Sequence, residues 1–409
     1  MGVMTTGTTD ATSETAPAMP RRALVIAPQP FFTPRGTPLS VYYRTLVTAE
    51  QGVRVDLLTY GRGEDVTIDG VRIIRIPAFR RLGEVKIGPS PLKLFLDVFL
   101  VLWTCALLLR HRYDFVHAHE EAVFFCLPLK SIFRFKLVYD MHSSLPQQLT
   151  NFGFTRSRLL IGTFAWLERA SLRAADAVIT ICPDLADYAL RLLDDPDKHE
   201  LIENSIFEDV RLARPMADAQ DGTQVAIPAD RPLIVYAGTL EPYQGIELLL
   251  RAFAAARARA PDSFLLIVGG TPEQVAAYRA LARELDIAAH CYFTGRLPQR
   301  AARRLVARAA VQVSPRIHGT NTPLKVYEQL ASGIPLVATD IYSHRQVLDD
   351  KVAFLAQPEP AAFADALVAA LHDAPARAER IAAAQRLYAC KYSRAAYVAK
   401  LRRLLRRLA

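Results

Sequence analysis

Residues 314–340 hold the side chains best suited to chemistry, in the sequence SPRIHGTNTPLKVYEQLASGIPLVATD. The pattern predicts a strand, a loop, a helix, a turn and a second strand. Thr322 is a good N-cap and Pro323 suits the first helical position, so the helix should begin there with unpaired N–H groups. Those groups attract anions, and Arg316 and Lys325 would add positive charge beside them. The segment therefore predicts a phosphate-binding site.

A carboxylate follows one helical turn beyond this phosphate site. Glu328 comes three residues after Lys325, so the two should share one face of the helix. There the carboxylate could accept hydrogen bonds from both hydroxyls of a ribose. The alternative is an ordinary surface ion pair with Lys325, which is favoured when the pair is considered alone. The loop-forming neighbours favour a binding site instead, and these are Gly319, Asn321, Gly333 and Pro335.

These residues resemble the donor-binding segment of a large family of retaining glycosyltransferases with the GT-B fold. The family includes sucrose synthases and many bacterial mannosyl- and glucosyltransferases. Two glutamates separated by seven residues contact the donor sugar and the ribose in that family. The second maps on Glu328, whereas the first maps on Thr320. The resemblance therefore implies that groups of the loop 319–321 contact the sugar in place of the first glutamate.

A second match to this family lies at residues 236–253, YAGTLEPYQGIELLLRAF. It resembles the strand, loop and helix that open the donor domain. Family members place an arginine and a lysine around this loop to neutralise the diphosphate, and those positions hold Thr239 and Gln244 here. We expect Arg316 and Lys325 to supply the missing charge. The donor-binding residues implied by the two matches are Gly238, Thr239, Gln244, Gly245, Gly319, Thr320, Asn321, Thr322, Pro323, Leu324 and Glu328.

Three weaker matches lie in the N-terminal half. The first, FFTPRGTP at 31–38, contains Gly36, which lets the backbone approach a phosphate or an acceptor closely. The second, HAHE at 117–120, ends a predicted strand and puts His117 and His119 on one side. Spaced histidines could bind a metal ion, but the sequence shows no third ligand. We therefore expect no metal at this position.

The third match is YDMHSS at 139–144, where Asp140 and His142 share one face of a strand. The family has a histidine at this place near the reacting sugar, and a capped structural histidine is the alternative. The resemblance implies three catalytic residues, His142, Arg316 and Lys325. It also implies a set of residues on the acceptor side, namely Arg35, Gly36, Thr37, His119, Glu120 and Asp140.

Strand-like and helix-like segments alternate along the chain and must position these residues. Strands are predicted at 23–27, 53–60, 71–76, 115–119, 137–141 and 177–180, and helices at 39–49, 92–109, 159–173 and 185–193. A second series of strands follows at 233–237, 264–268, 292–293, 311–314 and 336–338, with alanine-rich helices between them. Alternation of this kind predicts an α/β fold with doubly wound parallel sheets covered by helices on both faces. The resemblance implies that these form two Rossmann-like domains facing a cleft, which is the GT-B architecture.

The same pattern suggests where the domains begin and end. We expect a disordered leader at 1–19 and an N-terminal acceptor-side domain at 20–206. An interdomain connection at 207–231 leads to a C-terminal nucleotide-sugar-binding domain at 232–374. The helices at 375–409 should pack back toward the N-terminal domain. At 409 residues the chain is too long for one ordinary core, which agrees with two domains.

Composition narrows the setting and the partners. The net charge of +9 favours polyanions, anionic lipid or phosphorylated small molecules. The resemblance selects a nucleotide-diphosphate sugar among these and implies no nucleic acid. Five cysteines, without a CxxC pair, argue against a disulfide framework and indicate a reducing compartment. We therefore expect a cytoplasmic protein, and peripheral contact with the inner face of the membrane stays open.

Two apolar segments bear on membrane contact. Residues 92–109 are interrupted by Lys93 and Asp97, so we expect a buried or interface-dipping helix rather than a membrane span. The C-terminal KLRRLLRRLA predicts a basic amphipathic helix that either lies on an anionic surface or docks on its own protein. Basic Arg80, Arg81 and Lys86 precede the first segment. A lipid-linked or membrane-surface glycan acceptor is therefore open, as is a soluble acceptor.

The resemblance implies an enzyme, a retaining hexosyltransferase that uses a UDP- or GDP-linked sugar and needs neither cofactor nor metal. Its expected role is glycan or glycolipid biosynthesis. Two alternatives belong to other classes. One is a nucleotide-sugar epimerase or hydrolase of the same fold, which would release sugar without forming a glycoside. The other is a non-catalytic nucleotide-sugar-binding subunit, which the missing glutamate, arginine and lysine of the family pattern favour.

Overall fold

The computed structural model describes residues 20–33, 36–79, 83, 85, 90–146, 157–204, 210, 227–228 and 230–409. The predicted leader at 1–19 and most of the connection at 207–231 lie outside these residues. Arg35 of the predicted acceptor side also lies outside them, as do the basic residues Arg80, Arg81 and Lys86.

The first half of the chain forms a seven-stranded parallel sheet in the order β3-β2-β1-β4-β5-β6-β7. Its strands are β1 (Arg22–Pro30), β2 (Arg54–Tyr60), β3 (Val71–Arg75), β4 (Phe115–His119), β5 (Lys136–Met141), β6 (Ala177–Thr180) and β7 (His199–Leu201). Its helices are α1 (Gly36–Glu50), α2 (Pro91–Arg110), α3 (Ala122–Phe133), α5 (Arg158–Ala174) and α6 (Pro183–Leu190). The strand order reverses between β1 and β4, and ligands of such sheets bind beyond the carboxyl ends of the strands at that point.

Apolar side chains cover both faces of this sheet. On one face, residues of α2, α3 and α6 form a core that includes Leu100, Val123 and Leu185. On the other face, α1 packs with the last helix of the chain, through Val41, Tyr43 and neighbouring residues. Near-continuous apolar strands such as LVI in β1 are typical of a sheet buried on both sides.

The second half forms a six-stranded parallel sheet in the order β10-β9-β8-β11-β12-β13. Its strands are β8 (Leu233–Ala237), β9 (Phe264–Val268), β10 (Cys291–Phe293), β11 (Val311–Ser314), β12 (Leu336–Thr339) and β13 (Phe354–Ala356). Its helices are α7 (Ile246–Ala256), α8 (Pro272–Glu284), α9 (Gln299–Val306), α10 (Lys325–Ala331), α11 (Tyr342–Arg345) and α12 (Pro360–His372). Here the order reverses between β8 and β11, so the loops after these two strands are where a ligand is expected.

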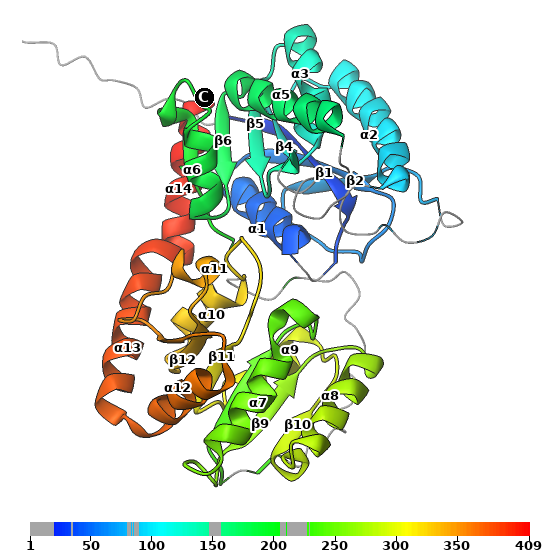
Figure 1. The fold of residues 1–409 in the computed structure, drawn as a ribbon. Helices are drawn as coiled ribbons and strands as arrows, with labels where there is room; N and C mark the ends of the chain where they lie inside the picture. Colours follow the sequence, from blue (N-terminus) through cyan, green and yellow to red (C-terminus); the bar gives the residue numbers. More distant parts are fainter. Residues whose placement is uncertain are drawn as a thin grey trace, which may run out of the picture.

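The last helices return from the second sheet to the first. Helix α13 (Ala374–Leu387) lies on the C-terminal domain, and after a short π-helical turn α14 (Arg394–Arg407) runs along the N-terminal domain, as Figure 1 shows. The four leucines of the amphipathic tail are buried against the N-terminal sheet. Lys400 and Arg403 pair with Glu203 and Glu200 of that domain, each at 2.6 Å. The tail therefore docks on its own protein, which decides between the two alternatives left by the sequence.

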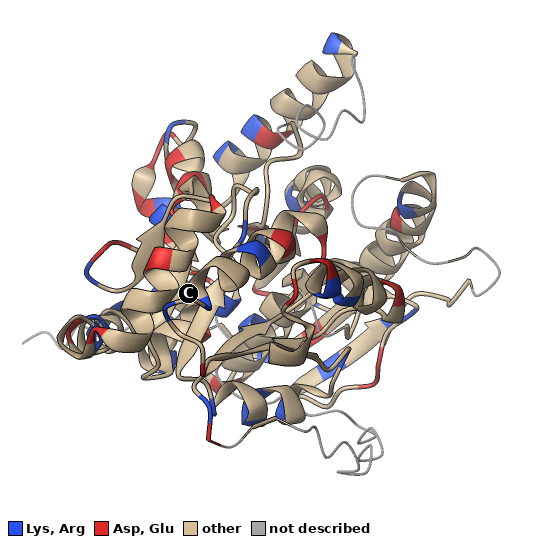
Figure 2. Ribbon diagram, turned by 60° about the horizontal axis from the view of Figure 1, so that its bottom comes forward, with Lys and Arg blue, Asp and Glu red and all other residues tan. Residues whose placement is uncertain are grey.

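The predicted strands agree with the structure to within a few residues, and three elements were missed. Helix α3 was missed because AVFFCLPLKSIF is apolar almost throughout and shows no helical period. Strands β7 and β13 were missed because three-residue strands are too short to show a repeat. Basic and acidic residues are interspersed along the ribbon, so the net charge of +9 is a modest excess over a mixed surface (Figure 2).

Candidate active site at the facing edges of the two sheets

Two cations lie side by side at the switch point of the C-terminal sheet. Arg316 follows β11 and Lys325 begins α10. The Lys325 ammonium lies 4.0 Å from the centroid of the Tyr236 ring and 3.5 Å from Oε1 of Gln244. The Arg316 guanidinium lies 5.3 Å from the Tyr243 ring and donates to the carbonyl of His318 at 2.6 Å. Within the described residues, neither cation pairs with a carboxylate.

Burial perturbs both cations. It lowers the pKa of Lys325 to about 7, and the charge of Arg316 adds to this effect. Burial also lowers the pKa of Arg316. A bound anion would raise the pKa of both cations again, because it supplies the negative charge that no neighbouring carboxylate in the described structure provides. The pair therefore has the properties of an anion site.

Two glycines lie beside these cations at positions where a side chain would not fit. A Cβ atom on Gly238 would lie 2.9 Å from the Tyr236 hydroxyl and 3.7 Å from Nζ of Lys325. A Cβ atom on Gly319 would lie 1.9 Å from the Arg316 guanidinium. Both glycines have a positive φ, of 153° for Gly238 and 132° for Gly319. Residues that carry a side chain rarely adopt this backbone conformation. The first avoids crowding of the Tyr236 hydroxyl next to Lys325, and the second lets the loop lie against the Arg316 guanidinium.

The helix after this loop begins later than the sequence predicts. Thr322 makes no capping hydrogen bond and Pro323 is not the first helical residue, because α10 begins at Lys325 with Leu324 at its N-cap. The Val326 N–H instead donates to the Pro323 carbonyl at 3.0 Å, which makes a tight turn before the helix. The prediction that the helix starts at Pro323 is therefore wrong by two residues. Lys325 consequently occupies the first turn, where its side chain reaches Tyr236.

Glu328 does not pair with Lys325. Its carboxylate accepts a hydrogen bond from Arg303 of α9 at 2.9 Å, because Lys325 is turned inward. The sequence-based alternative of a Lys325–Glu328 surface pair is therefore wrong. The Glu328 side chain is 37% exposed, so a ligand hydroxyl can reach it.

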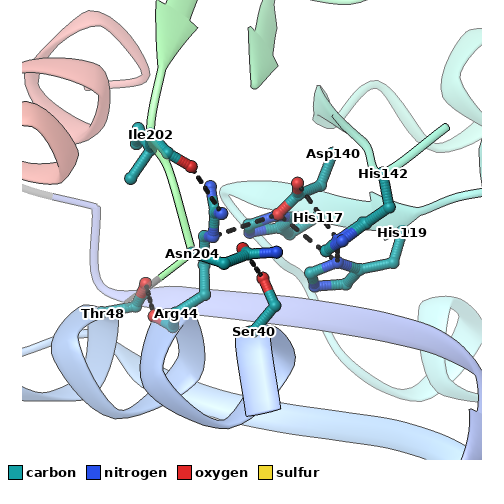
Figure 3. Close-up of polar contacts among 9 residues, drawn as sticks. All are labelled: Ser40, Arg44, Thr48, His117, His119, Asp140, His142, Ile202 and Asn204. Atoms are coloured by element: carbon teal, nitrogen blue, oxygen red, sulfur yellow. Dashed lines mark hydrogen bonds and ion pairs between the residues drawn. The ribbon is translucent and has the colours of Figure 1, made fainter. Parts of the chain in front are cut away.

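A buried cluster of histidines surrounds Asp140 at the carboxyl edge of the N-terminal sheet (Figure 3). His117 Nε2 lies 2.9 Å from Asp140 Oδ2, and His142 Nε2 lies 3.3 Å from Oδ1. His119 Nδ1 is 3.1 Å from His142 Nε2. On the other side, Arg44 of α1 places its Nε 3.2 Å from Asp140 Oδ2 and donates to the Ile202 carbonyl at 3.2 Å. Strands β4 and β5 thus present these groups together.

The charges of this cluster are balanced. Burial alone would raise the pKa of Asp140, but the charge of Arg44 and the neighbouring imidazoles hold it well below its usual range. Burial lowers the pKa of His142 to about 4 against the opposing charge of Asp140. His142 is therefore neutral at pH 7, with Nδ1 free of a hydrogen-bond partner in the described structure. A neutral imidazole can donate or accept a hydrogen bond with a sugar hydroxyl.

The cluster also supplies the third metal ligand that the sequence did not reveal. Ligand atoms of His117, His119 and Asp140 all lie within 4.8 Å of one another. The sequence-based conclusion that a third ligand is absent is therefore wrong, because Asp140 is a third candidate ligand. The charge of Arg44 already neutralises Asp140, so a divalent ion here would be buried without compensating negative charge. The electrostatics of the cluster thus favour a hydrogen-bonded network over a metal centre.

The remaining acceptor-side residues lie at the switch point of the N-terminal sheet. Gly36 and Thr37 open α1, and Glu120 follows β4 with a φ of 50°. Burial, together with the charge of Glu121, raises the pKa of Glu120 to about 7. A carboxyl group poised in this way can exchange protons or hydrogen bonds with a hydroxyl group near neutral pH.

The loop that precedes α10, residues 319–324, contacts the N-terminal domain directly. Asn321 donates to the His142 carbonyl at 3.2 Å, and Leu324 packs against the core of the N-terminal sheet. The Thr320 carbonyl accepts a hydrogen bond from Gln346, whose Oε1 accepts one from the Asp184 backbone at 3.1 Å. The predicted donor and acceptor residues therefore meet across the two domains. Thr239 and Gly245 belong to the same edge, through the Tyr236 hydroxyl and the start of α7.

Sequence reasoning missed three residues that support the site. Arg44 is fully buried, and its only sequence signal is a charge within the apolar run VYYRTLV. Tyr236 belongs to strand β8, and the centroid of its ring lies 4.0 Å from the Lys325 ammonium. The Nδ1 of His344 donates to the Thr339 carbonyl at 2.8 Å, and its Nε2 is hydrogen-bonded to Ser314 Oγ at 2.9 Å. These two bonds hold the ends of β11 and β12 together. Arg44 and His344 stand in no recognisable motif, and Tyr236 begins the matched segment 236–253 without a role of its own there.

Two doubly wound parallel sheets that face each other through their switch points define the GT-B class of proteins. Two family models match the chain. The model of the glycosyl transferase 4-like domain matches residues 44–205, and the model of glycosyl transferases group 1 matches residues 219–387. Together they take in most of the chain. The chain therefore belongs to the family-4-like glycosyltransferases with the GT-B fold.

Curated relatives match over part of their length. The alpha-maltose-1-phosphate synthase of Mycolicibacterium smegmatis is 30% identical over 46% of this chain and 49% of its own. The phosphatidyl-myo-inositol mannosyltransferase of Mycobacterium tuberculosis is 34% identical over 35% of this chain and 38% of its own. The aligned parts thus span less than half of these relatives.

Solved structures share the fold over nearly the whole chain. The sucrose-phosphate synthase of Thermosynechococcus elongatus has a TM-score of 0.72 at 22% identity, covering 95% of this chain and 99% of its own. WaaG, a glycosyltransferase involved in lipopolysaccharide biosynthesis, has a TM-score of 0.65 at 16% identity and covers 93% of this chain and 98% of its own. At sequence identities of 22% and 16%, these comparisons show a shared fold and nothing more.

Proposed function

We propose that the protein transfers a sugar from a nucleotide-diphosphate sugar, UDP- or GDP-linked, to an acceptor hydroxyl with retention of anomeric configuration. One observation carries the proposal. Lys325 and Arg316 are partly buried cations without a carboxylate partner in the described structure, and they lie beside Gly238, where a side chain would crowd Tyr236. A diphosphate supplies the missing negative charge, and family membership makes a nucleotide sugar its natural source.

The chemistry follows from where charge develops. Breaking the bond between the sugar and the diphosphate leaves positive character on the sugar and negative charge on the leaving phosphate. Lys325 and Arg316 stabilise that phosphate, so no metal ion is needed. Glu328 accepts hydrogen bonds from the ribose. His142, neutral at pH 7, contacts the sugar from the other domain together with the loop 319–321, which stands in for the missing glutamate at Thr320.

Retention requires that the acceptor attack from the side of the leaving group. The departing phosphate oxygen then accepts the proton of the acceptor hydroxyl, and no carboxylate nucleophile is involved. We assign Glu120 and Thr37 to the acceptor hydroxyl, because the pKa of Glu120 near 7 would let it exchange a proton or hydrogen bond there. The relative that acts as a phosphatidyl-myo-inositol mannosyltransferase supports a lipid-linked acceptor, and hence a protein on the cytoplasmic face of a membrane.

A screen of nucleotide sugars tests the proposal. UDP- and GDP-linked sugars should raise the melting temperature of the wild-type protein, and the shift should shrink for Glu328→Ala. The stabilising donor is then incubated with lipid extracts and simple glycosides, with and without EDTA, and the product anomer is read by NMR. A glycoside of unchanged anomeric configuration, formed in EDTA, is expected.

The same assay separates the alternatives. Release of free sugar or an epimer without a glycoside would identify the epimerase or hydrolase. Binding without turnover by any acceptor would identify the binding subunit, and an inverted product would overturn the retaining mechanism.

A further inference from the structure

Large apolar side chains are exposed on one side of the N-terminal domain. Of the twelve such side chains exposed in the described part of the chain, nine belong to α2, α3 and α5. We call the exposed side of these helices the three-helix apolar face. Its most exposed members are Leu94, Val98 and Leu109 of α2, Ile132 of α3, and Leu159 and Trp166 of α5. A cluster of this many exposed apolar side chains is unusual on the surface of a soluble protein and marks a site of interaction.

Helix α2 is the longest apolar element of the face and is covered by the domain on one side only. Its 20 residues are long and apolar enough to cross a membrane, with a mean hydropathy of 2.2, yet only 28% of the apolar stretch is buried. Leu96, Leu100 and Leu107 pack into the core of the sheet. The helix is therefore fixed along the domain, and the side carrying Leu94 and Val98 remains uncovered.

The three helices form one continuous surface that reaches the acceptor side. Helix α3 packs against both α2 and α5, and Figure 1 shows the three at the same end of the domain. At the start of α2, Lys93 pairs with Glu121, the neighbour of Glu120. The face thus begins next to the residues that we assign to the acceptor.

The charges on these helices select the partner. Every exposed charged residue on α2, α3 and α5, all of whose residues are described, is an arginine. These are Arg110, Arg158, Arg169 and Arg173, of which Arg173 also pairs with the exposed Asp194 at 3.4 Å. The two acidic residues are directed inward. Asp97 accepts from the Tyr60 hydroxyl at 2.5 Å, and Glu168 accepts from Tyr188 at 2.6 Å. A second copy of the same face would bring like charges together, whereas anionic lipid headgroups would complement them.

We propose that the three-helix apolar face docks on an anionic phospholipid bilayer. The apolar side chains enter the interface, and the arginines contact the phosphates at its surface. The entrance to the acceptor side is then held at the membrane. This last step deepens the acceptor part of the proposed function and rests on it, whereas docking itself does not.

Vesicle binding tests the docking. The purified full chain is floated with vesicles of phosphatidylcholine alone and of phosphatidylcholine with phosphatidylglycerol, at low and high salt. Binding is expected only with the anionic vesicles, and salt should weaken it. The double variant Val98→Asp, Leu102→Asp changes exposed positions and should lower the partition coefficient at least about tenfold, since burial of each side chain is lost. Leu190→Asp, at an exposed apolar position outside the face, is the matched control and should bind as wild type does.

The outcomes separate docking from catalysis. Failure to bind anionic vesicles, or equal binding by wild type and the double variant, would overturn the docking. So would a lipid-free dimer that the double variant dissociates in sedimentation velocity, because the face would then belong to a second copy. UDP and GDP affinity should be the same in wild type and both variants. Vesicle binding without transfer from any nucleotide sugar would leave the docking intact and remove the proposed function.

Discussion

Replacing Lys325 with methionine should stabilise the free protein and weaken its complex with a nucleoside diphosphate. Methionine fills most of the space of the lysine side chain, but it carries no charge and so loses the cation–π contact with Tyr236. Lys325 is partly buried beside Arg316 without a carboxylate partner in the described structure, so its charge opposes folding. The same charge should favour binding of a diphosphate. The two effects have opposite signs, and few substitutions at an ordinary structural position would produce both.

The size of each effect follows from the site. Lowering a lysine pKa from 10.5 to about 7 corresponds to about 5 kcal/mol of unfavourable charge burial at pH 7, at ~1.4 kcal/mol for each tenfold change in affinity for the proton. Relaxation around the charge and the loss of the contact with Tyr236 reduce the gain, so we expect Lys325→Met to add about 2–3 kcal/mol to the free energy of unfolding. Loss of a charge-assisted hydrogen bond to phosphate, worth about 1.5–3 kcal/mol, should weaken UDP or GDP binding about 10- to 100-fold.

The pH dependence has a definite sign. Because the folded pKa lies below the unfolded one, the destabilisation by Lys325 is complete below about pH 7 and disappears as the pH rises toward 10.5. The stability difference between Lys325→Met and wild type should therefore be largest below pH 7. Nucleotide affinity of the wild type should fall as the pH rises above 7, because free Lys325 loses its proton, and this dependence should be absent from Lys325→Met.

Urea denaturation of the free protein and calorimetric titration with UDP and GDP measure the two quantities. Lys351→Met removes a charge from an exposed lysine of the same domain and serves as the control, with neither quantity changed. Unchanged nucleotide affinity in Lys325→Met, or a loss of stability of the free protein, would refute the reasoning.

Other predictions concern the remaining parts of the site. Arg44→Met leaves Asp140 buried without its cation and should lower the free energy of unfolding by about 3–5 kcal/mol in urea denaturation; a change under 1 kcal/mol would contradict the buried pair. Glu328→Ala should weaken UDP or GDP binding about tenfold but leave pyrophosphate binding unchanged in the same titration, and equal losses for both ligands would place Glu328 at the phosphates. His142→Ala should slow transfer about 100-fold while nucleotide affinity stays the same, whereas unchanged turnover would remove His142 from the reaction.

Much of the fold was predictable because parallel sheets buried on both faces leave a simple pattern. Strands such as 115–119 and 233–237 are short apolar runs between helix-length segments, and their observed bounds match those predicted. The tail from Lys400 was predictable only as far as its amphipathic pattern. Whether its leucines face lipid or protein depends on an apolar surface contributed by α1 and the N-terminal sheet, far away in the sequence.

The site was predictable in its motifs and less so in its contacts. Loop and strand-end residues such as Arg316 and Asp140 carry local signals, because they follow short apolar strands at the edge where ligands of parallel sheets bind. The partner of Glu328 was not predictable, since Arg303 lies on a different helix and the rotation of Lys325 toward Tyr236 is decided by packing. Arg44 was not predictable for the same reason, because its partner Asp140 comes from a strand distant in the sequence.

The structure of the protein with UDP or GDP bound is the most direct test of the central claim. We predict diphosphate oxygens within hydrogen-bond distance of the Lys325 ammonium and the Arg316 guanidinium, beside Gly238, with the ribose hydroxyls on Glu328. A nucleotide bound with its phosphates away from both cations would contradict the account.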